Sequence, residues 1–144
     1  MNILVIEDHE ALREVTLSAL GEMGHKARGI SSAEALPAEL ESCVPHILIL
    51  DLNLPGEDGI SLAGRLRRMR PEIGIIMVTA RIELSDKISG YESGADIYLT
   101  KPTSLEELTA AVYALSRRII QTFSSAQTLV HSSPQLFLYA ISLC

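Results

Sequence analysis

Five polar side chains follow short apolar runs in this sequence and together could carry out phosphoryl chemistry. They are three carboxylates, a hydroxyl and an ammonium, at Glu7, Asp8, Asp51, Thr79 and Lys101. If the apolar runs form neighbouring parallel strands, their carboxyl ends meet at one edge of the sheet. Crowded carboxylates bind a divalent cation, and a carboxylate beside a hydroxyl and an ammonium can accept a phosphoryl group. The sequence therefore predicts a phosphorylation site at this edge.

The apolar runs have the length and composition of buried strands. They lie at residues 3–6, 47–50, 75–78 and 97–99, with a weaker candidate at 26–30. Continuous runs of Ile, Leu and Val are typical of strands that are buried on both faces. Helical patterns separate the runs, and this alternation predicts right-handed crossover connections. We therefore expect an α/β fold, a doubly wound sheet of five parallel strands.

Caps, breakers and apolar spacing indicate where the helices lie. We expect one from the acidic pair to about Gly24, one that begins late or kinks at Pro37, and others over about 59–70, 85–94 and 104–120. The last is the clearest, because Ser104 and Glu107 have the spacing of a capping box. In the first helix we expect one apolar stripe to face the core, made of Leu12, Val15, Ala19, Leu20 and Met23.

Size and charge limit the classes of protein that the chain can belong to. Its 144 residues suit one compact domain with a short extension, and its net charge is -6. No basic run exceeds two residues, which argues against direct binding of nucleic acid. Only Cys43 and Cys144 are present, and no segment approaches the roughly twenty apolar residues of a membrane helix. We expect a reducing, cytoplasmic setting and no contact with a membrane.

The composition changes after Gln121, where Ser, Thr and Gln replace charged residues until Pro134 and an apolar end. We expect the main domain over residues 1–121 and treat 122–144 as a linker or tail of uncertain structure. The composition of this segment is compatible with three alternatives: a linker to an output domain outside this sequence, an added helix that packs on the core, or a segment without a selected role.

Residues 2 to about 121 resemble the receiver domain of two-component response regulators. The motifs that carry the resemblance occur in order: Glu7-Asp8, Asp51 in Asp-Leu-Asn-Leu-Pro-Gly-Glu-Asp-Gly, Thr79-Ala80, Gly94-Ala95-Asp96-Ile97-Tyr98-Leu99 and Lys101-Pro102. The resemblance implies a flavodoxin-like (βα)5 fold with strand order 2-1-3-4-5. It also implies a cis peptide bond between Lys101 and Pro102.

The resemblance assigns a role to each site residue. Asp51 would accept a phosphoryl group from a sensor histidine kinase, while Lys101 and Thr79 would contact the phosphoryl oxygens. The implied Mg²⁺ ligands are Asp8, Asp51, the backbone carbonyl of Asn53, and Glu7 acting through water. The domain would catalyse only its own phosphorylation and slow dephosphorylation, so we do not expect an enzyme.

Thr79 and Tyr98 are the implied switch residues, acting on the face made by the fourth helix, fifth strand and fifth helix. A buried core tyrosine is the alternative for Tyr98. Many relatives form a charged homodimer through this face, but here Ile97 replaces an acidic residue and no Arg stands at Ala111 or Val112. The resemblance therefore leaves dimerisation open, through an altered and more apolar contact.

Other functional classes fit less well. A stand-alone phosphorelay receiver and a truncated transcription factor share the same site, and these motifs do not separate them. A haloacid dehalogenase-type phosphohydrolase needs a second acid two residues after the nucleophile, where Asn53 stands. A flavodoxin-like cofactor binder needs a phosphate loop after the first strand, where this chain has the anion-repelling sequence Glu7-Asp8-His9-Glu10.

Overall fold

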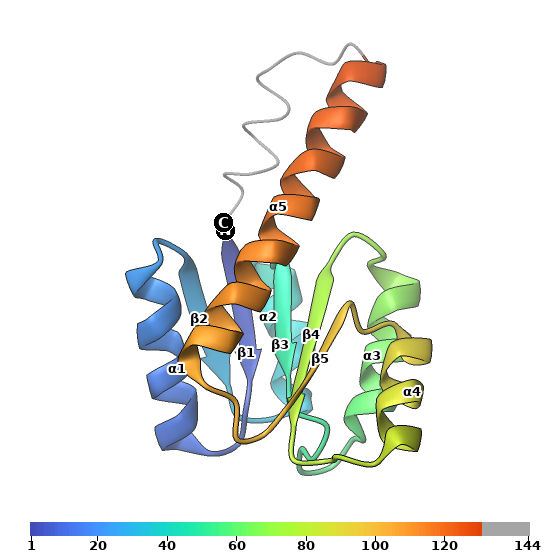
Figure 1. Cartoon of the computed structure of the whole chain (residues 1–144). Coiled ribbons are helices and arrows are strands. Elements are labelled where there is room, and N and C mark those ends of the chain that lie inside the picture. The colour runs from blue at the N-terminus through green and yellow to red at the C-terminus, as the bar shows by residue number, and fades with distance from the viewer. Residues whose placement is uncertain (131–144) are drawn as a thin grey trace.

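A computed structural model describes residues 1–130 and contains one five-stranded parallel sheet (Figure 1). The strands are β1 (Asn2–Ile6), β2 (Lys26–Ile30), β3 (Ile47–Leu50), β4 (Gly74–Thr79) and β5 (Ile97–Thr100). Their order in the sheet is β2-β1-β3-β4-β5, and every neighbouring pair is parallel. The expected fold class, strand number and strand order are confirmed.

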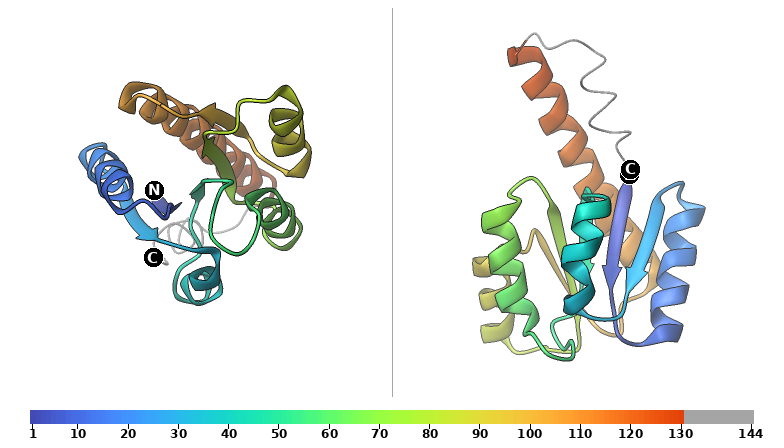
Figure 2. Two further views of the ribbon diagram at one scale, coloured as in Figure 1. Left: turned by 90° about the horizontal axis from the view of Figure 1, so that it is seen from below. Right: turned by 180° about the vertical axis from the view of Figure 1, so that it is seen from behind.

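Helices cover both faces of the sheet. They are α1 (Glu10–Glu22), α2 (Leu36–Ser42), α3 (Gly59–Met69), α4 (Leu84–Ser93) and α5 (Leu105–Val130), with a 3-10 turn, η1 (Ala33–Ala35), before α2. Helices α1 and α5 lie on one face, while α2 and α3 lie on the other, as the view from behind shows (Figure 2). Helix α4 packs beside α3 and β5.

The alternation of side chains along each strand produces two separate cores. Leu4, Leu48 and Ile75 point to the side of α2 and α3, where they pack with Leu62 and Leu66. Their neighbours in the strands point to the other side and pack against α1 and α5; this second core includes Ile3, Val5, Ile47, Ile49, Ile76, Leu20, Leu108, Val112 and Leu115. Burial on both faces explains why these strands are continuously apolar.

Most helix starts and ends follow the sequence signals. Asp58 is the N-cap of α3, and the Ser104 hydroxyl accepts a 3.1 Å hydrogen bond from the Glu107 backbone N–H at the start of α5. Pro37 lies in the first turn of α2, so that helix begins late, as expected. Gly94 ends α4 with a φ of 130°, a conformation that favours glycine.

Two expectations about the helices are wrong. Helix α5 extends to Val130 rather than ending near Ile120, because residues 121–130 contain neither Gly nor Pro to stop it. The expected tail beyond residue 130 lies outside the described residues. In α1, Leu20 is buried, but Leu12, Val15 and Met23 are 38%, 49% and 37% exposed. Thr16 is buried instead, because its hydroxyl donates to the Leu12 carbonyl at 2.9 Å.

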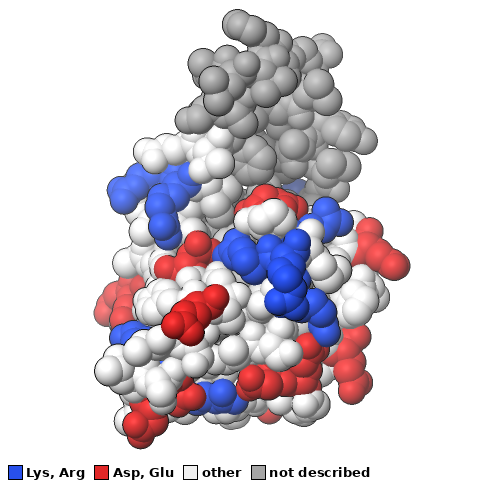
Figure 3. Space-filling model, turned by 90° about the vertical axis from the view of Figure 1, so that its right-hand side faces the viewer, with Lys and Arg blue, Asp and Glu red and all other residues white. Residues whose placement is uncertain are grey.

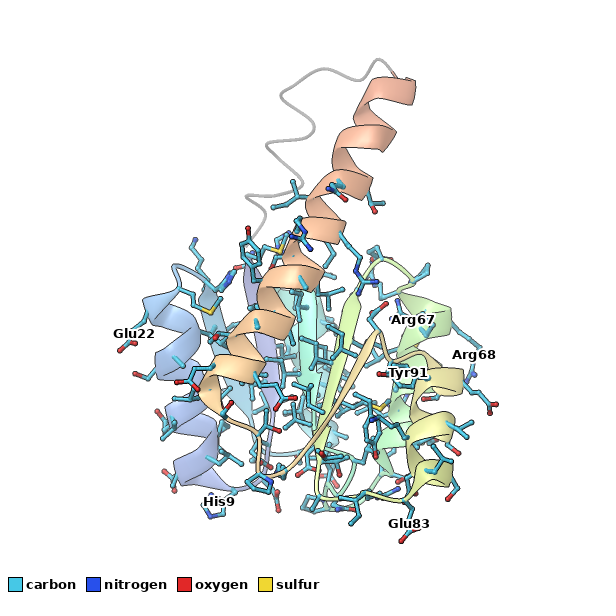
Figure 4. The ribbon with its side chains drawn as sticks, in the orientation of Figure 1. His9, Glu22, Arg67, Arg68, Glu83 and Tyr91 are labelled. Carbon is cyan, nitrogen blue, oxygen red and sulfur yellow. The ribbon has the colours of Figure 1, made fainter. Side chains whose placement is uncertain are left out.

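One arginine holds the end of α3 against the start of β4 and the turn before β5. The Arg67 guanidinium donates to the carbonyls of Pro71, Ile73 and Gly94 and pairs with the Asp96 carboxylate at 2.8 Å. Figure 4 labels it together with Arg68, and Figure 3 shows that Lys and Arg side chains gather on one side of the molecule. Three further arginines, Arg65, Arg68 and Arg70, lie in or directly after α3. Several of these are paired locally, Arg65 with Glu57 among them. This clustering therefore serves the fold and does not alter the expectation about nucleic acid.

Candidate functional site

The register of the sheet brings four of the sequence-predicted site residues to one edge. Ile6 pairs with Leu50, so Glu7 and Asp51 leave their strands side by side. The Asp51 backbone N–H donates to the Ile6 carbonyl at 3.2 Å, and the Lys101 backbone N–H donates to the Thr79 carbonyl at 2.7 Å. This is the carboxyl edge of the parallel sheet, as predicted.

Lys101 joins two of the buried carboxylates. Its ammonium donates to Glu7 Oε1 at 2.6 Å and to Asp51 Oδ2 at 2.8 Å. The peptide bond from Lys101 to Pro102 is cis, as the resemblance implies. Glu7 and Asp51 are only 5% and 7% exposed. Burial of charged groups is costly unless they are paired, so Lys101 is the main compensation for this pair.

The pKa values at the site follow from burial and from Lys101. Burial alone would raise the pKa of Asp51, but the hydrogen bonds from Lys101 and from the Asn53 backbone N–H outweigh it and lower the pKa. Burial alone would lower the pKa of Lys101, yet its two carboxylate partners raise it. For Glu7 burial prevails and raises the pKa, helped by the nearby Asp51 charge, although Lys101 opposes this. Asp51 is therefore ionised at neutral pH.

The acidic cluster has the composition of a site for a hard cation. Oxygen atoms of Glu7, Asp8 and Asp51 lie within 4.8 Å of one another. The second carboxylate oxygen of Glu7, Oε2, is buried and has no hydrogen-bond partner. An unpaired buried carboxylate oxygen is costly, so this atom is available to accept a hydrogen bond from a water molecule on a bound cation. Asp8 and Asn53 are exposed beside it. These oxygen donors fit Mg²⁺.

We expect Glu7→Gln to stabilise the cation-free protein. Because the pKa of Glu7 is raised in the folded state, ionisation of Glu7 lowers the free energy of unfolding. This loss is fully present above the folded-state pKa. It disappears as the pH falls to 4.5, the ordinary pKa of a glutamate. At pH 7 the variant should gain about 1 kcal/mol in free energy of unfolding, measured by urea titration. Exposed Glu10→Gln is the matched control. Lower stability of Glu7→Gln at pH 7 would contradict this account of the site.

Thr79 lies buried at the end of β4, next to the loop that contains Arg81. Its hydroxyl oxygen accepts a 3.3 Å hydrogen bond from the Arg81 backbone N–H. The Tyr98 hydroxyl donates to the Arg81 carbonyl at 3.0 Å, and Tyr98 is 4% exposed. A Cβ on Gly90 would lie 2.7 Å from the Tyr98 ring, so only glycine gives the ring room. Tyr98 therefore points inward and is part of the core.

Sequence reasoning missed Arg81. Its guanidinium binds Asn53, Leu52 and Asp58 across the edge of the sheet. Its one sequence signal is its place two residues after Thr79, and nothing in the sequence indicates partners that lie more than twenty residues away.

A cleft with mostly apolar walls opens beside the acidic cluster, between α1 and α5. Its volume is about 420 Å³, and the polar groups of Glu7, Asp51 and Lys101 line one part of it. The walls come from α1, the strands and the start of α5 and include Leu12, Thr16, Val78, Pro102, Leu105 and Leu108. The imidazole of His9 caps α1 at the same end of the molecule (Figure 4). The carboxylates are thus reachable from this side.

The face formed by α4, β5 and α5 carries exposed apolar side chains. Leu84, Ile88, Tyr91 and Tyr113 are between 47% and 70% exposed, and the Tyr91 ring lies 6.3 Å from that of Tyr98. Ile97 is half-buried, whereas Val112 is fully buried. Val112 is thus part of the core against α1 and does not contribute to this surface.

Comparison with known proteins identifies the family. A family model described as a response regulator receiver domain matches residues 3–113. The transcriptional regulatory protein TcrA of Mycobacterium tuberculosis is 40% identical over 118 residues, which are 82% of this chain and 47% of TcrA. BasR of Escherichia coli, also a transcriptional regulatory protein, is 38% identical over 118 residues, 82% of this chain and 53% of BasR. The chain thus spans about half the length of these relatives.

Solved structures confirm the fold. The crystal structure of a CheY-like receiver domain protein from Methanospirillum hungatei superimposes with a TM-score of 0.79, covering 84% of this chain and 97% of the other at 24% identity. Within residues 1–130, no helix is long and apolar enough to cross a membrane. The family match and the identity to the two regulators show that the chain carries the receiver domain of a two-component response regulator and belongs to that family.

Proposed function

We propose that Asp51 accepts a phosphoryl group from a phosphohistidine of a sensor kinase, with Mg²⁺ bound by the acidic cluster. The observation that carries this proposal is the environment of Asp51. Its carboxylate is buried, has a lowered pKa, and lies within 2.8 Å of the only Lys that meets the acidic cluster in the described part of the chain. An ionised carboxylate needs no general base to act as a nucleophile.

The transfer would proceed by in-line attack of an Asp51 oxygen on phosphorus. The new O–P bond forms as the P–N bond to the kinase histidine breaks, and the imidazole nitrogen keeps the electron pair. Lys101 would then donate to both Asp51 and a phosphoryl oxygen, while the Thr79 hydroxyl would donate to another. Bound Mg²⁺ would supply positive charge for the phosphoryl oxygens. Hydrolysis of the acyl phosphate by water would return Asp51 to its starting state.

Asp8, Asp51 and the Asn53 backbone carbonyl would hold the cation, with Glu7 acting through water. The orphaned Glu7 Oε2 supports this set, since a water of the cation could donate to it. Asn53 cannot serve as an acid or base, and its carboxamide oxygen already accepts from Arg81 at 2.8 Å. This argues against a phosphohydrolase with a second catalytic acid.

The signal would leave the domain through the α4, β5 and α5 face. Thr79 and Tyr98 both contact Arg81 at the start of the loop before α4, which supports a role for these two residues in a shift between two arrangements. The relatives are transcriptional regulators, so we propose a DNA-binding output domain outside these residues; a stand-alone phosphorelay receiver is the alternative. We place the protein in the cytoplasm, and we propose homodimerisation through the apolar face.

The test is phosphorylation by a small phosphodonor. The protein is incubated with acetyl phosphate, with Mg²⁺ or with EDTA, and its intact mass is measured. We expect the mass of one phosphoryl group to appear only with Mg²⁺ and to be lost on treatment with hydroxylamine, which cleaves acyl phosphates. A mass that never changes although Mg²⁺ binds would refute the proposal.

A further inference from the structure

The guanidinium of Arg81 connects the loop after β4 with the loop after β3. Nε donates to Asn53 Oδ1 at 2.8 Å, and Nη2 donates to Asp58 Oδ1 at 2.8 Å and to the Leu52 carbonyl at 3.3 Å. All three partners lie in the segment that follows Asp51. The Arg81 side chain is 29% exposed; its bonds to Asn53 and Asp58 lie at the surface, and its bond to the Leu52 carbonyl is partly buried.

The backbone of Arg81 faces the opposite way, toward the switch residues. Its N–H donates to the Thr79 hydroxyl oxygen at 3.3 Å, and its carbonyl accepts from the Tyr98 hydroxyl at 3.0 Å. One residue therefore contacts the cation-binding loop with its side chain and the inward tyrosine with its main chain.

We propose that Arg81 is a positioning residue that couples cation and phosphoryl binding at Asp51 to the inward position of Tyr98. The inference rests on the proposed function and adds to it the element through which the two sites communicate. The Arg81 guanidinium holds the side-chain carboxamide of Asn53, and the backbone N–H of Asn53 donates to Asp51 Oδ1 at 3.0 Å. The Asn53 backbone carbonyl is the proposed cation ligand, so holding this residue orients a ligand.

Charge and positioning predict opposite results for this residue. Arg81 carries a positive charge near a cation site, so a purely electrostatic role means that its removal strengthens Mg²⁺ binding. A positioning role means that its removal weakens binding, because the Asn53 segment is no longer held. Loss of such an outer contact typically weakens metal binding about tenfold.

Arg81→Lys separates the two effects, because it keeps the charge and loses the paired donors of the guanidinium. We expect Mg²⁺, titrated while backbone amide NMR shifts are followed, to bind about tenfold more weakly to Arg81→Lys and to Arg81→Ala than to the unaltered chain. Arg65→Ala is the matched control. It removes an arginine that pairs with Glu57 of the same loop at 2.8 Å but touches neither Asn53 nor Asp51. Thermal unfolding verifies that each variant is folded.

Coupling to Tyr98 is tested with a double-mutant cycle. The probe is beryllofluoride with Mg²⁺, which mimics the phosphoryl group. Tyr98→Phe removes the hydroxyl that donates to Arg81 and should weaken probe binding several-fold in the unaltered background, by the reciprocity of linked equilibria. In the Arg81→Lys background the same substitution should have a clearly smaller effect.

The outcomes distinguish the two proposals. Equal Mg²⁺ affinity in Arg81→Lys and the unaltered chain, or tighter binding in Arg81→Ala, would overturn the positioning role and leave the proposed function intact. Strictly additive effects in the cycle would overturn the coupling. Absence of Mg²⁺ binding by the unaltered chain would refute the proposed function and, with it, this inference.

Discussion

Asp51→Asn is expected to abolish phosphorylation by acetyl phosphate. Asparagine has nearly the shape of aspartate, so the fold and the hydrogen bond from the Asn53 backbone N–H, 3.0 Å long in the native chain, should persist. The carboxamide nitrogen, however, carries no negative charge and cannot form an acyl phosphate. Among the described carboxylates only Glu7 is also buried and paired with Lys101, so any residual transfer would have to go to Glu7.

The measurement is intact mass after incubation with Mg²⁺ and acetyl phosphate, at a time when the parent protein has gained one phosphoryl group. Glu57→Gln is the control, since it removes one negative charge from the same loop, where Glu57 pairs with exposed Arg65. A normal gain in Asp51→Asn would mean that another group accepts the phosphoryl. Peptide mapping of borohydride-reduced protein would then identify it.

Lys101→Met should have the second largest effect, on stability as well as on transfer. The substitution keeps the length of the side chain and leaves Glu7 and Asp51 as neighbouring buried charges without a cation. Their side chains are only 7% and 9% exposed, against 24% for Lys101. Breaking a buried pair costs several kcal/mol, and partial exposure of the ammonium reduces this, so we expect a loss of about 2 kcal/mol at pH 7. Phosphoryl transfer should slow about a hundredfold.

The pH dependence of this loss checks its cause. In the parent, the pKa of Asp51 is lowered by folding, so ionised Asp51 stabilises the folded state. This stabilisation is present above pH 3.8, the ordinary pKa of an aspartate, and is lost as the pH falls through the lower pKa of the folded state. Without Lys101 both carboxyls favour protonation in the folded state, so the variant gains stability as the pH falls. The difference between variant and parent should therefore shrink between pH 7 and pH 5 in urea unfolding, and exposed Lys87→Met should show no such change. A difference independent of pH would point to lost packing instead.

The sequence predicted the fold best in the strands that are buried on both faces of the sheet, because such strands must be apolar along their whole length. Strands β1, β3 and β4 are largely continuous apolar runs, and candidate site residues directly follow or end them. In a parallel sheet all carboxyl ends lie on one side, so the position of the site could be predicted without knowing the register. The caps at Asp58 and Ser104 were readable for a similar reason, because they depend on local sequence.

Two features were missed, one for a local reason and one because its partners are distant in the sequence. The apolar stripe of α1 was misjudged because Thr16, a polar residue, satisfies its hydroxyl within the helix and is buried while Val15 is exposed. Arg81 could not be singled out, because its role comes from Asn53 and Asp58, which only the packed sheet brings near. Position in the fold, more than residue type, gives this arginine its partners.

Helix α5 is long enough to turn a small tilt at its first turn into a large displacement of its far end. Its 26 residues span about 39 Å at 1.5 Å per residue. The helix begins four residues after Lys101, beside the edge that contains the proposed phosphoacceptor, and runs past the opposite edge of the sheet (Figure 1). A tilt of about 5° at its base would move the far end by about 3 Å over that length. Rearrangements too small to disturb the core would thus become displacements large enough for the proposed output domain to detect.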